Sequence, residues 1–478
     1  MMRKKGSVTV FLTLILSLLL SLICASIESV RMASARTQIL NGMDIGLYSL
    51  FGQYDKELLT DYDLFALDGS GGGGQLDLAA VCDELEAYMN PVLKQNSQKL
   101  TLCQSGLTGY RLLTDQNGEA FYQQIVGYMQ ETLGSQGIQL LLGRMSERQE
   151  KTAQADQSAN QAQSKGSIDR YDSEMNQASE KSQQAAEEAQ VVPQAPPAKN
   201  PITIMKRIMK RGVLELVLPG GNGLSTKAIE KGTLVSGRGL QQGLEMPDGM
   251  TTENGYTSEV LFQQYLMEHL GSYAEPSSAG LAYQMEYIFG GKDSDEDNLK
   301  AVASKLLFIR EGVNFACLMA DNVKRSEAQA LATAIASGFL VPPAAVIIEA
   351  ALILCWAFAE SVLDVRELFA GGRIPLVKSS ADWQISLGNL PDLMEGLDSM
   401  RRNDEKGMSY NDYLQVLVLT VSKEKKVMRV MDMIENTIRE KGRRNFCMDS
   451  CIVALEAFAD VKANKKKDFQ VIRQYCYE

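Results

Sequence analysis

The sequence predicts an α+β protein that is predominantly helical, with a single N-terminal transmembrane helix, a large extracytoplasmic region and minor antiparallel strands. Three observations lead to this prediction. An uncharged apolar stretch lies near the N-terminus, apolar residues recur at three- and four-residue steps over much of the chain, and the last segment alternates in polarity. The alternation predicts a C-terminal β-hairpin, and its alternative is a helix over Cys451–Val461.

The N-terminal stretch has the length of a membrane span. Ser7–Ile27 covers 21 residues, which is about 30 Å of helix and matches the hydrocarbon core of a bilayer. The cations at 3–5 precede it, so the positive-inside rule places the N-terminus in the cytoplasm and the bulk of the chain outside. The alternative is a secretory signal that is removed near Ala25 and Ser26. The following residues are compatible with helix and contain no proline, which favours an anchor that stays.

We predict six segments along the chain. They are a cytoplasmic basic N-terminus (1–6), the transmembrane helix (7–27), a helical stalk (28–70), a small α+β region (76–145), a polar low-complexity linker (146–200) and a mainly helical extracytoplasmic domain (201–478) that ends in the β-hairpin. Within the α+β region, the alternating stretch 97–113 predicts a strand between two helices. The linker is predicted because large apolar side chains almost vanish there. A partner-binding arm is its alternative interpretation.

A second apolar stretch, Ala344–Ala359, is another candidate for a membrane span. It is only 16 residues long and Glu349 interrupts it, so we predict a core helix with a buried Trp356. An unpaired buried charge is too costly to keep. Glu349 is therefore expected to lie at a helix end, to meet a cation or hydrogen-bond donors, or to be neutral. The alternative is a second span that returns the C-terminus to the cytoplasm.

Composition and motifs do not point to a catalytic site. The net charge of −11 argues against nucleic acid as a partner. The lone histidine, His269, lies in a helical pattern, and the chain has no His-Glu-x-x-His or Cys-x-x-Cys motif. The acidic stretch "DSDEDN" at 293–298 lacks the glycine and the closing glutamate of a calcium loop, so it is expected to cap a helix. We expect no enzymatic activity, no cofactor and no metal.

The eight cysteines are too few for a disulfide scaffold in a chain of this length. Cys82 and Cys103 are a candidate disulfide pair, because both fall in the region predicted to be outside the cell. Simple burial of each thiol is the alternative.

The stretch "KKGSVTVFLTLILSLLLSLICASIESVR" resembles the start of TadE- and TadG-type pseudopilins of Tad/Flp pili. In pilins of this class a prepilin peptidase cuts after the glycine, so the resemblance implies processing between Gly6 and Ser7. This sequence departs from the family at the fifth mature position, where Phe11 stands in place of a glutamate.

Four later stretches resemble an uncharacterised bacterial family of membrane-anchored proteins encoded beside Tad-type pilus genes. They are "LFGQYDKELLTDYDLFALD", "GLAYQMEYIFGGKDSDEDNLKAVASKLLFIRE", "AESVLDVRELFAGGRIPLVK" and "GMSYNDYLQVLVL". The resemblance implies a bitopic, non-catalytic accessory of a Tad/Flp-type pilus or secretion system, either minor pseudopilin-like or a scaffold. Its expected partners are the bacterial cytoplasmic membrane and Tad-like components. The alternative is an extracytoplasmic binding, sensor or adhesin-like protein.

Overall fold

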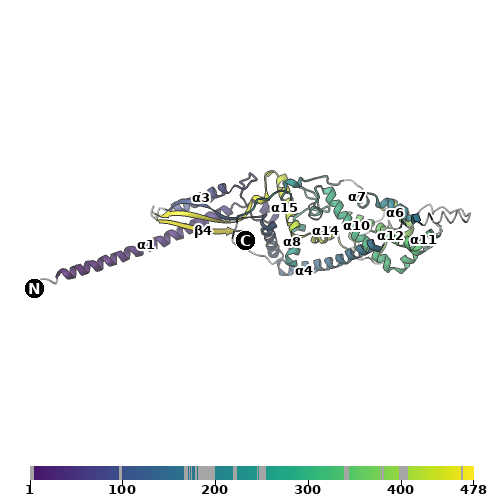
Figure 1. Ribbon diagram of the computed structural model, residues 1–478, viewed down its shortest axis with the longest axis horizontal. Coiled ribbons are helices and arrows are strands. Elements are labelled where there is room, and N and C mark those ends of the chain that lie inside the picture. The colour runs from purple at the N-terminus through teal and green to yellow at the C-terminus, as the bar shows by residue number, and fades with distance from the viewer. Residues whose placement is uncertain are drawn as a thin grey trace. The chain divides into compact units, whose positions relative to one another are not determined.

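The chain divides into two compact units. The first comprises residues 1–128, 237–253 and 438–478, and the second comprises 129–236 and 254–437. Figure 1 shows the computed structural model with its elements labelled. It describes residues 5–95, 100–165, 171, 173, 175–177, 180, 200–218, 223–244, 246, 255–338, 344–376, 378, 382–397, 407–463 and 467–477.

The first unit is built on an antiparallel sheet. Its central strand is β3 (Cys451–Ala463), and β2 (Leu100–Leu112) pairs along one edge of it. The short β1 (Leu67–Asp68) and the longer β4 (Lys467–Cys476) pair with the other edge. The C-terminal hairpin and the strand predicted within 97–113 are therefore both present.

The hairpin packs in a different place from the one the sequence indicated. It was expected to end the helical domain 201–478, but it joins the sheet of the first unit through β2. The physical reason is that a two-stranded hairpin leaves one edge of each strand unpaired. β2 supplies the missing hydrogen-bond partners along nearly the whole of β3.

Two helices cover one face of this sheet and form its core. The C-terminal half of α1 (Lys5–Phe51) and the amphipathic α3 (Leu78–Lys94) pack together over alternate residues of β3. The core side chains come from all three elements: Ile39, Met43, Leu47, Leu85, Met89, Leu93, Leu455, Ala457, Ala459 and Val461. The short α2 (Lys56–Tyr62) follows α1 and is capped by Asp55, whose carboxylate accepts hydrogen bonds from the N–H groups of Glu57 and Leu58.

The second unit is helical, and most of its elements are amphipathic or buried. Its helices are the 129–165 part of α4 (Asp115–Lys165), α6 (Pro201–Met209), α7 (Val213–Val217), η1 (Lys231–Thr233), α8 (Tyr256–His269), α9 (Gln284–Gly290), α10 (Asp295–Ala320), α11 (Asn322–Gly338), α12 (Ala345–Phe369), η4 (Leu387–Asp392), α13 (Leu393–Gly396), α14 (Tyr410–Leu419) and the 423–437 part of α15 (Lys423–Glu440). Helix α12 lies against α10 and α11.

In the first unit, η5 (Met448–Ser450) precedes β3.

The structure differs from the expected linker at its N-terminal end. Residues 146–160 continue α4, and Ala155 and Ala159 are buried. Alanine is small enough to let two helices approach closely: a Cβ placed on Gly312 of α10 would lie 2.3 Å from the Cα of Ala159. Further along the expected linker, residues 166–170, 172, 174, 178–179 and 181–199 lie outside the described residues.

Helix α12 is mostly enclosed by protein, which supports the prediction of a core helix. In its most apolar 18-residue window, 78% of residues are buried. Trp356 is 2% exposed, and its Nε1 donates a hydrogen bond to the carbonyl oxygen of Ile385 at 2.6 Å. Its ring also meets Trp383 edge to face at 5.8 Å between centroids. Val346, in the first turn, is 73% exposed, so the burial begins after that turn.

Replacing Trp356 by alanine is predicted to destabilise the second unit by about 3–5 kcal/mol, because the change opens a cavity and removes one of the two indole donors to the carbonyl oxygen of Ile385, the other being Trp383. Denaturant unfolding of the detergent-solubilised full chain, followed by far-UV circular dichroism, measures this loss. The control is Val346→Ala on the exposed side of the same helix, with an expected change within about 0.5 kcal/mol. Equal effects of the two substitutions would contradict the placement of Trp356 in the core.

Candidate functional site

The second half of α12 carries charged side chains inside the protein. Glu360 and Asp364 lie one helical turn apart on the same face, and both side chains are at most 1% exposed. Neither was predicted from the sequence, because the predicted core helix ended at Ala359. A carboxylate pair at this spacing, directly after an apolar run on one helix, is the signal that could have identified them.

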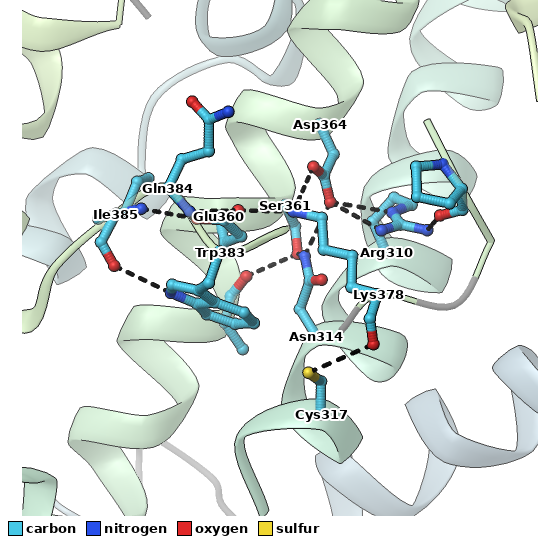
Figure 2. A network of polar contacts seen from close by, with 12 residues as sticks. Arg310, Asn314, Cys317, Glu360, Ser361, Asp364, Lys378, Trp383, Gln384 and Ile385 are labelled. Carbon is cyan, nitrogen blue, oxygen red and sulfur yellow. Dashed lines mark hydrogen bonds and ion pairs between the residues drawn. The ribbon is translucent and has the colours of Figure 1, made fainter. Parts of the chain in front are cut away.

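Asp364 has different partners on its two oxygens, as Figure 2 shows. Oδ2 accepts hydrogen bonds from Arg310 Nε at 3.1 Å, Arg310 Nη2 at 2.9 Å and Asn314 Nδ2 at 3.0 Å. Oδ1 lies 2.6 Å from Lys378 Nζ. Arg310 and Asn314 are one turn apart on α10, so their donors reach the same oxygen.

Lys378 is shared between the two carboxylates. Its Nζ lies 2.6 Å from Glu360 Oε1, and its side chain is fully buried. The backbone N–H groups of Gln384 and Ile385 donate to Glu360 at 3.0–3.3 Å, which fixes that carboxylate in place. The ring of Trp383 faces the ammonium at 5.6 Å.

Arg310 also ties the chain after α12 to α10. Its Nη1 donates to the carbonyl oxygens of Pro375 and Leu376 at 2.9 and 3.0 Å, and to the hydroxyl of Tyr413 at 3.2 Å. The buried network (Arg310, Glu360, Asp364 and Lys378) thus holds two cations and two anions. Such a balanced cluster is tolerated in a protein interior, whereas removing one member leaves an uncompensated charge.

The charges within the network control the ionisation of Asp364. Burial by itself would raise the pKa of this carboxyl, but the positive charges of Lys378 and Arg310 outweigh burial and hold the pKa below its usual value. Asp364 and Lys378 are therefore an ion pair in the resting structure.

A cavity of about 420 Å³ adjoins the network between α4 and α10. Lys378 reaches its wall, as does Cys317, whose thiol donates to the carbonyl oxygen of Lys378 at 3.7 Å. Burial raises the pKa of the Cys317 thiol, so this group is not activated as a nucleophile.

A second buried carboxylate, Glu286 on α9, lies among tyrosines. Its Oε1 accepts hydrogen bonds from the Tyr410 hydroxyl at 2.6 Å and from the Tyr273 N–H at 2.8 Å. Its Oε2 has no hydrogen-bond partner among the described residues. Burial raises the pKa of Glu286 to about 7, because the two hydrogen bonds offset only part of the desolvation.

The first unit contains a polar groove of about 900 Å³ where β2 leads into α4. Asp115 shapes it by accepting hydrogen bonds from the N–H groups of Leu112 at 2.7 Å and Gly243 at 3.0 Å. Gln116 and Asn117 adopt left-handed backbone conformations, with φ of 52° and 59°. Such conformations are strained for residues other than glycine and often occur at functional sites.

The residues predicted from the sequence lie elsewhere. Gly6 and Ser7 belong to the first turns of α1, and the predicted cleavage between them stays a prediction. Cys82 lies on α3 and Cys103 on β2, and the disulfide proposed between them is not formed in the structure, where both thiols are free. Burial raises the pKa of the Cys82 thiol, with the acidic residues beside it adding to the rise.

The structure also shows the contacts of three other features named in the sequence analysis. His269 ends α8, its Nδ1 lies 3.1 Å from the carbonyl oxygen of Tyr265, and the two rings stack. "DSDEDN" begins α10, where the hydroxyl of Ser294 accepts a hydrogen bond from the N–H of Asp297, as expected for a cap. Glu349 lies near the start of α12, 4.0 Å from a guanidinium nitrogen of Arg325.

Comparison with known proteins identifies the family. Residues 193–463 match the profile of DUF5702, a family of unknown function. The chain belongs to this family. The match covers the helices that carry the buried network, and it provides no link to Tad/Flp pilus genes. No curated protein and no solved structure matches the chain.

The raised pKa of Glu286 predicts that stability depends on pH. The folded protein holds a proton on Glu286 that the unfolded chain releases above about pH 4.5, so stability falls as pH rises from about 4.5 to 7. The shift corresponds to at most about 3 kcal/mol. Glu286→Gln is expected to reduce this dependence, as measured by denaturant midpoints at pH 5 and pH 8, and the part due to Glu311, whose pKa burial also raises to about 7, should remain. Glu275→Gln, on an exposed side chain, is the control. An unchanged pH dependence in Glu286→Gln would contradict the assignment.

Proposed function

We propose that this protein is a non-catalytic, membrane-anchored accessory of a Tad/Flp-type pilus or secretion system, either minor pseudopilin-like or a scaffold. The observation that carries the proposal is the division of α1 into two halves. One half is apolar and exposed, and the other half is fixed in the core of the first unit.

The N-terminal half of α1 has the surface of a membrane span. Its most apolar window has a mean hydropathy of 2.7 and no buried residues. Residues 8–27 carry no charge. The hydroxyls of Thr13, Ser17 and Ser21 donate to backbone carbonyls one turn earlier at 2.8–2.9 Å, so these polar groups are satisfied without water.

The C-terminal half of the same helix is packed tightly. A Cβ placed on Gly46 would lie 2.6 Å from the side chain of Met89, so the glycine lets α3 approach α1. Tyr477, at the end of the chain, donates its hydroxyl to the carbonyl oxygen of Phe51 at 2.6 Å. Because α1 is helical from Lys5 to Phe51, an anchor in the bilayer would be joined to the sheet by continuous helix.

The proposed orientation follows from charge. The basic residues 3–5 stay in the cytoplasm, and the chain after Glu28 lies outside. Peptidase processing between Gly6 and Ser7 belongs to this proposal. So does the expectation that the protein does not act as an enzyme on other molecules.

An extracytoplasmic binding or sensor protein is the second candidate, and the polar groove of the first unit favours it. Thr114 lines this groove, is 4% exposed, and its hydroxyl has no hydrogen-bond partner among the described residues. The two candidate functions predict different effects of deleting the gene. Loss of an accessory abolishes pilus assembly or secretion, whereas loss of a binding protein leaves assembly intact.

The orientation predicts which thiols a membrane-impermeant maleimide reaches on intact cells. Cys103 and Cys476 are exposed in the first unit and should be labelled before lysis. Cys24, in the anchor, should be protected by lipid. Variants that each keep one cysteine, with the other seven replaced by serine or alanine, make the test. Labelling of Cys103 only after lysis would contradict the proposed orientation.

A second experiment tests the accessory role itself. Removing residues 5–27 should release the protein from the membrane and abolish pilus assembly or secretion by the Tad-type system in the same cell. The control is a chain in which a single-pass anchor of unrelated sequence replaces residues 5–27. This chain is attached to the membrane but lacks the pseudopilin-like surface. Normal assembly without the gene would overturn the accessory role.

A further inference from the structure

We propose that Lys378 and Asp364 become joined by an intramolecular isopeptide bond that the protein forms by itself, with Glu360 as the proton carrier. The proposal rests on the buried network and is independent of the accessory role. It gives that network a chemical function, which is a covalent link between the core helix α12 and the segment that follows it.

The two reacting groups are held together before any reaction. Lys378 Nζ contacts Oδ1 of Asp364 at 2.6 Å, and neither side chain is more than 1% exposed. Groups held in this way behave as though at very high concentration, because no translational or rotational freedom is lost on the way to the transition state. The burial also limits the access of bulk water, which would favour hydrolysis over condensation.

The donors around Asp364 are placed for attack on its carbonyl carbon. When an amine adds to a carboxyl group, negative charge grows on the oxygen that is retained. Oδ2 receives two hydrogen bonds from Arg310 and one from Asn314, all between 2.9 and 3.1 Å. These donors form an oxyanion site on Oδ2, and Oδ1, on the side of Lys378, is left as the departing oxygen.

Glu360 provides the path for protons. Its Oε1 lies 2.6 Å from the same Nζ, and backbone N–H groups of Gln384 and Ile385 hold it there. Glu360 takes a proton from the ammonium, which frees the nitrogen lone pair, and passes this proton to Oδ1 of Asp364. After the addition it takes a second proton from the nitrogen and passes it to the same oxygen, which then leaves as water. Its own ionisation is the same before and after the reaction.

The reaction is balanced without an oxidant or a co-reactant. A new bond joins Lys378 Nζ to Asp364 Cγ, the bond from Cγ to Oδ1 breaks, and one water leaves. The three protons of the ammonium are distributed between that water, which takes two, and the amide nitrogen, which keeps one. One cation and one anion disappear together, so Arg310 and Glu360 remain as a neutral pair in the core.

A second ion pair of a buried lysine, in the same unit, serves as a comparison. Lys426 Nζ lies 2.6 Å from Glu259 Oε1, and the lysine is 1% exposed. The Glu259 side chain is 38% exposed, so water competes at the carboxylate. This ion pair has the same length but lacks the enclosed site, and it should stay unlinked.

The test is peptide mapping of the full chain, purified in detergent, denatured and digested with trypsin. The bond should join the peptide 326–366, which contains Asp364, to the peptide 374–401, in which cleavage after Lys378 is blocked. The joined product should weigh one water less than the sum of its parts. Peptides containing Lys426 and Glu259 should be unlinked in the same digest.

Two variants assign the roles. Lys378→Met should yield the free peptide 326–366, and Glu360→Gln should yield mostly unlinked peptides while the chain keeps its helical circular dichroism. Stoichiometric recovery of free 374–378 and free 326–366 from the natural sequence would overturn the proposal without reference to any variant. A folded Glu360→Gln chain that is fully linked would overturn the role of Glu360.

Discussion

The buried charges of α12 are the constraint on which the second unit depends. An apolar helix of this kind gains stability by leaving water, but Glu360 and Asp364 lose hydration when it does so. The two carboxylates gain new partners in the fold. These are Arg310 from α10, Lys378, and backbone N–H groups in the chain after Lys378. Arg310 also binds the carbonyls of Pro375 and Leu376, so the carboxylates of α12 fix both a neighbouring helix and the chain that follows.

The need to pair buried charges also distinguishes the two apolar helices, α12 and the N-terminal half of α1. Both are long and apolar enough to cross a bilayer by composition. In α12 the charges find protein partners, and most of the apolar surface is covered. In the N-terminal half of α1 no charge needs a partner, and the apolar side chains are exposed. One helix is therefore suited to a protein interior and the other to lipid, although their hydropathy is similar.

Local patterns in the sequence predicted the elements well and their partners poorly. The apolar run and its interrupting glutamate predicted α12, and alternation predicted β3 and β4. The pairing of β3 with β2 joins residues more than three hundred positions apart, and no local pattern specifies it. Lys378 could not be predicted for the same reason, since only the fold brings it to its carboxylate partners. The alanine-rich part of α4 has the composition of a polar linker, and its small side chains become core residues only where Gly312 lets a helix approach.

Helix α12 is mostly enclosed by protein, and we propose that α1 alone anchors the chain. The direct measurement is light scattering after size-exclusion chromatography, without detergent, on a chain of residues 32–478, which lacks the exposed half of α1. We expect soluble, monodisperse protein whose α12 amides resist hydrogen exchange. A chain that needs detergent, or that stays bound to liposomes at high salt, would contradict it.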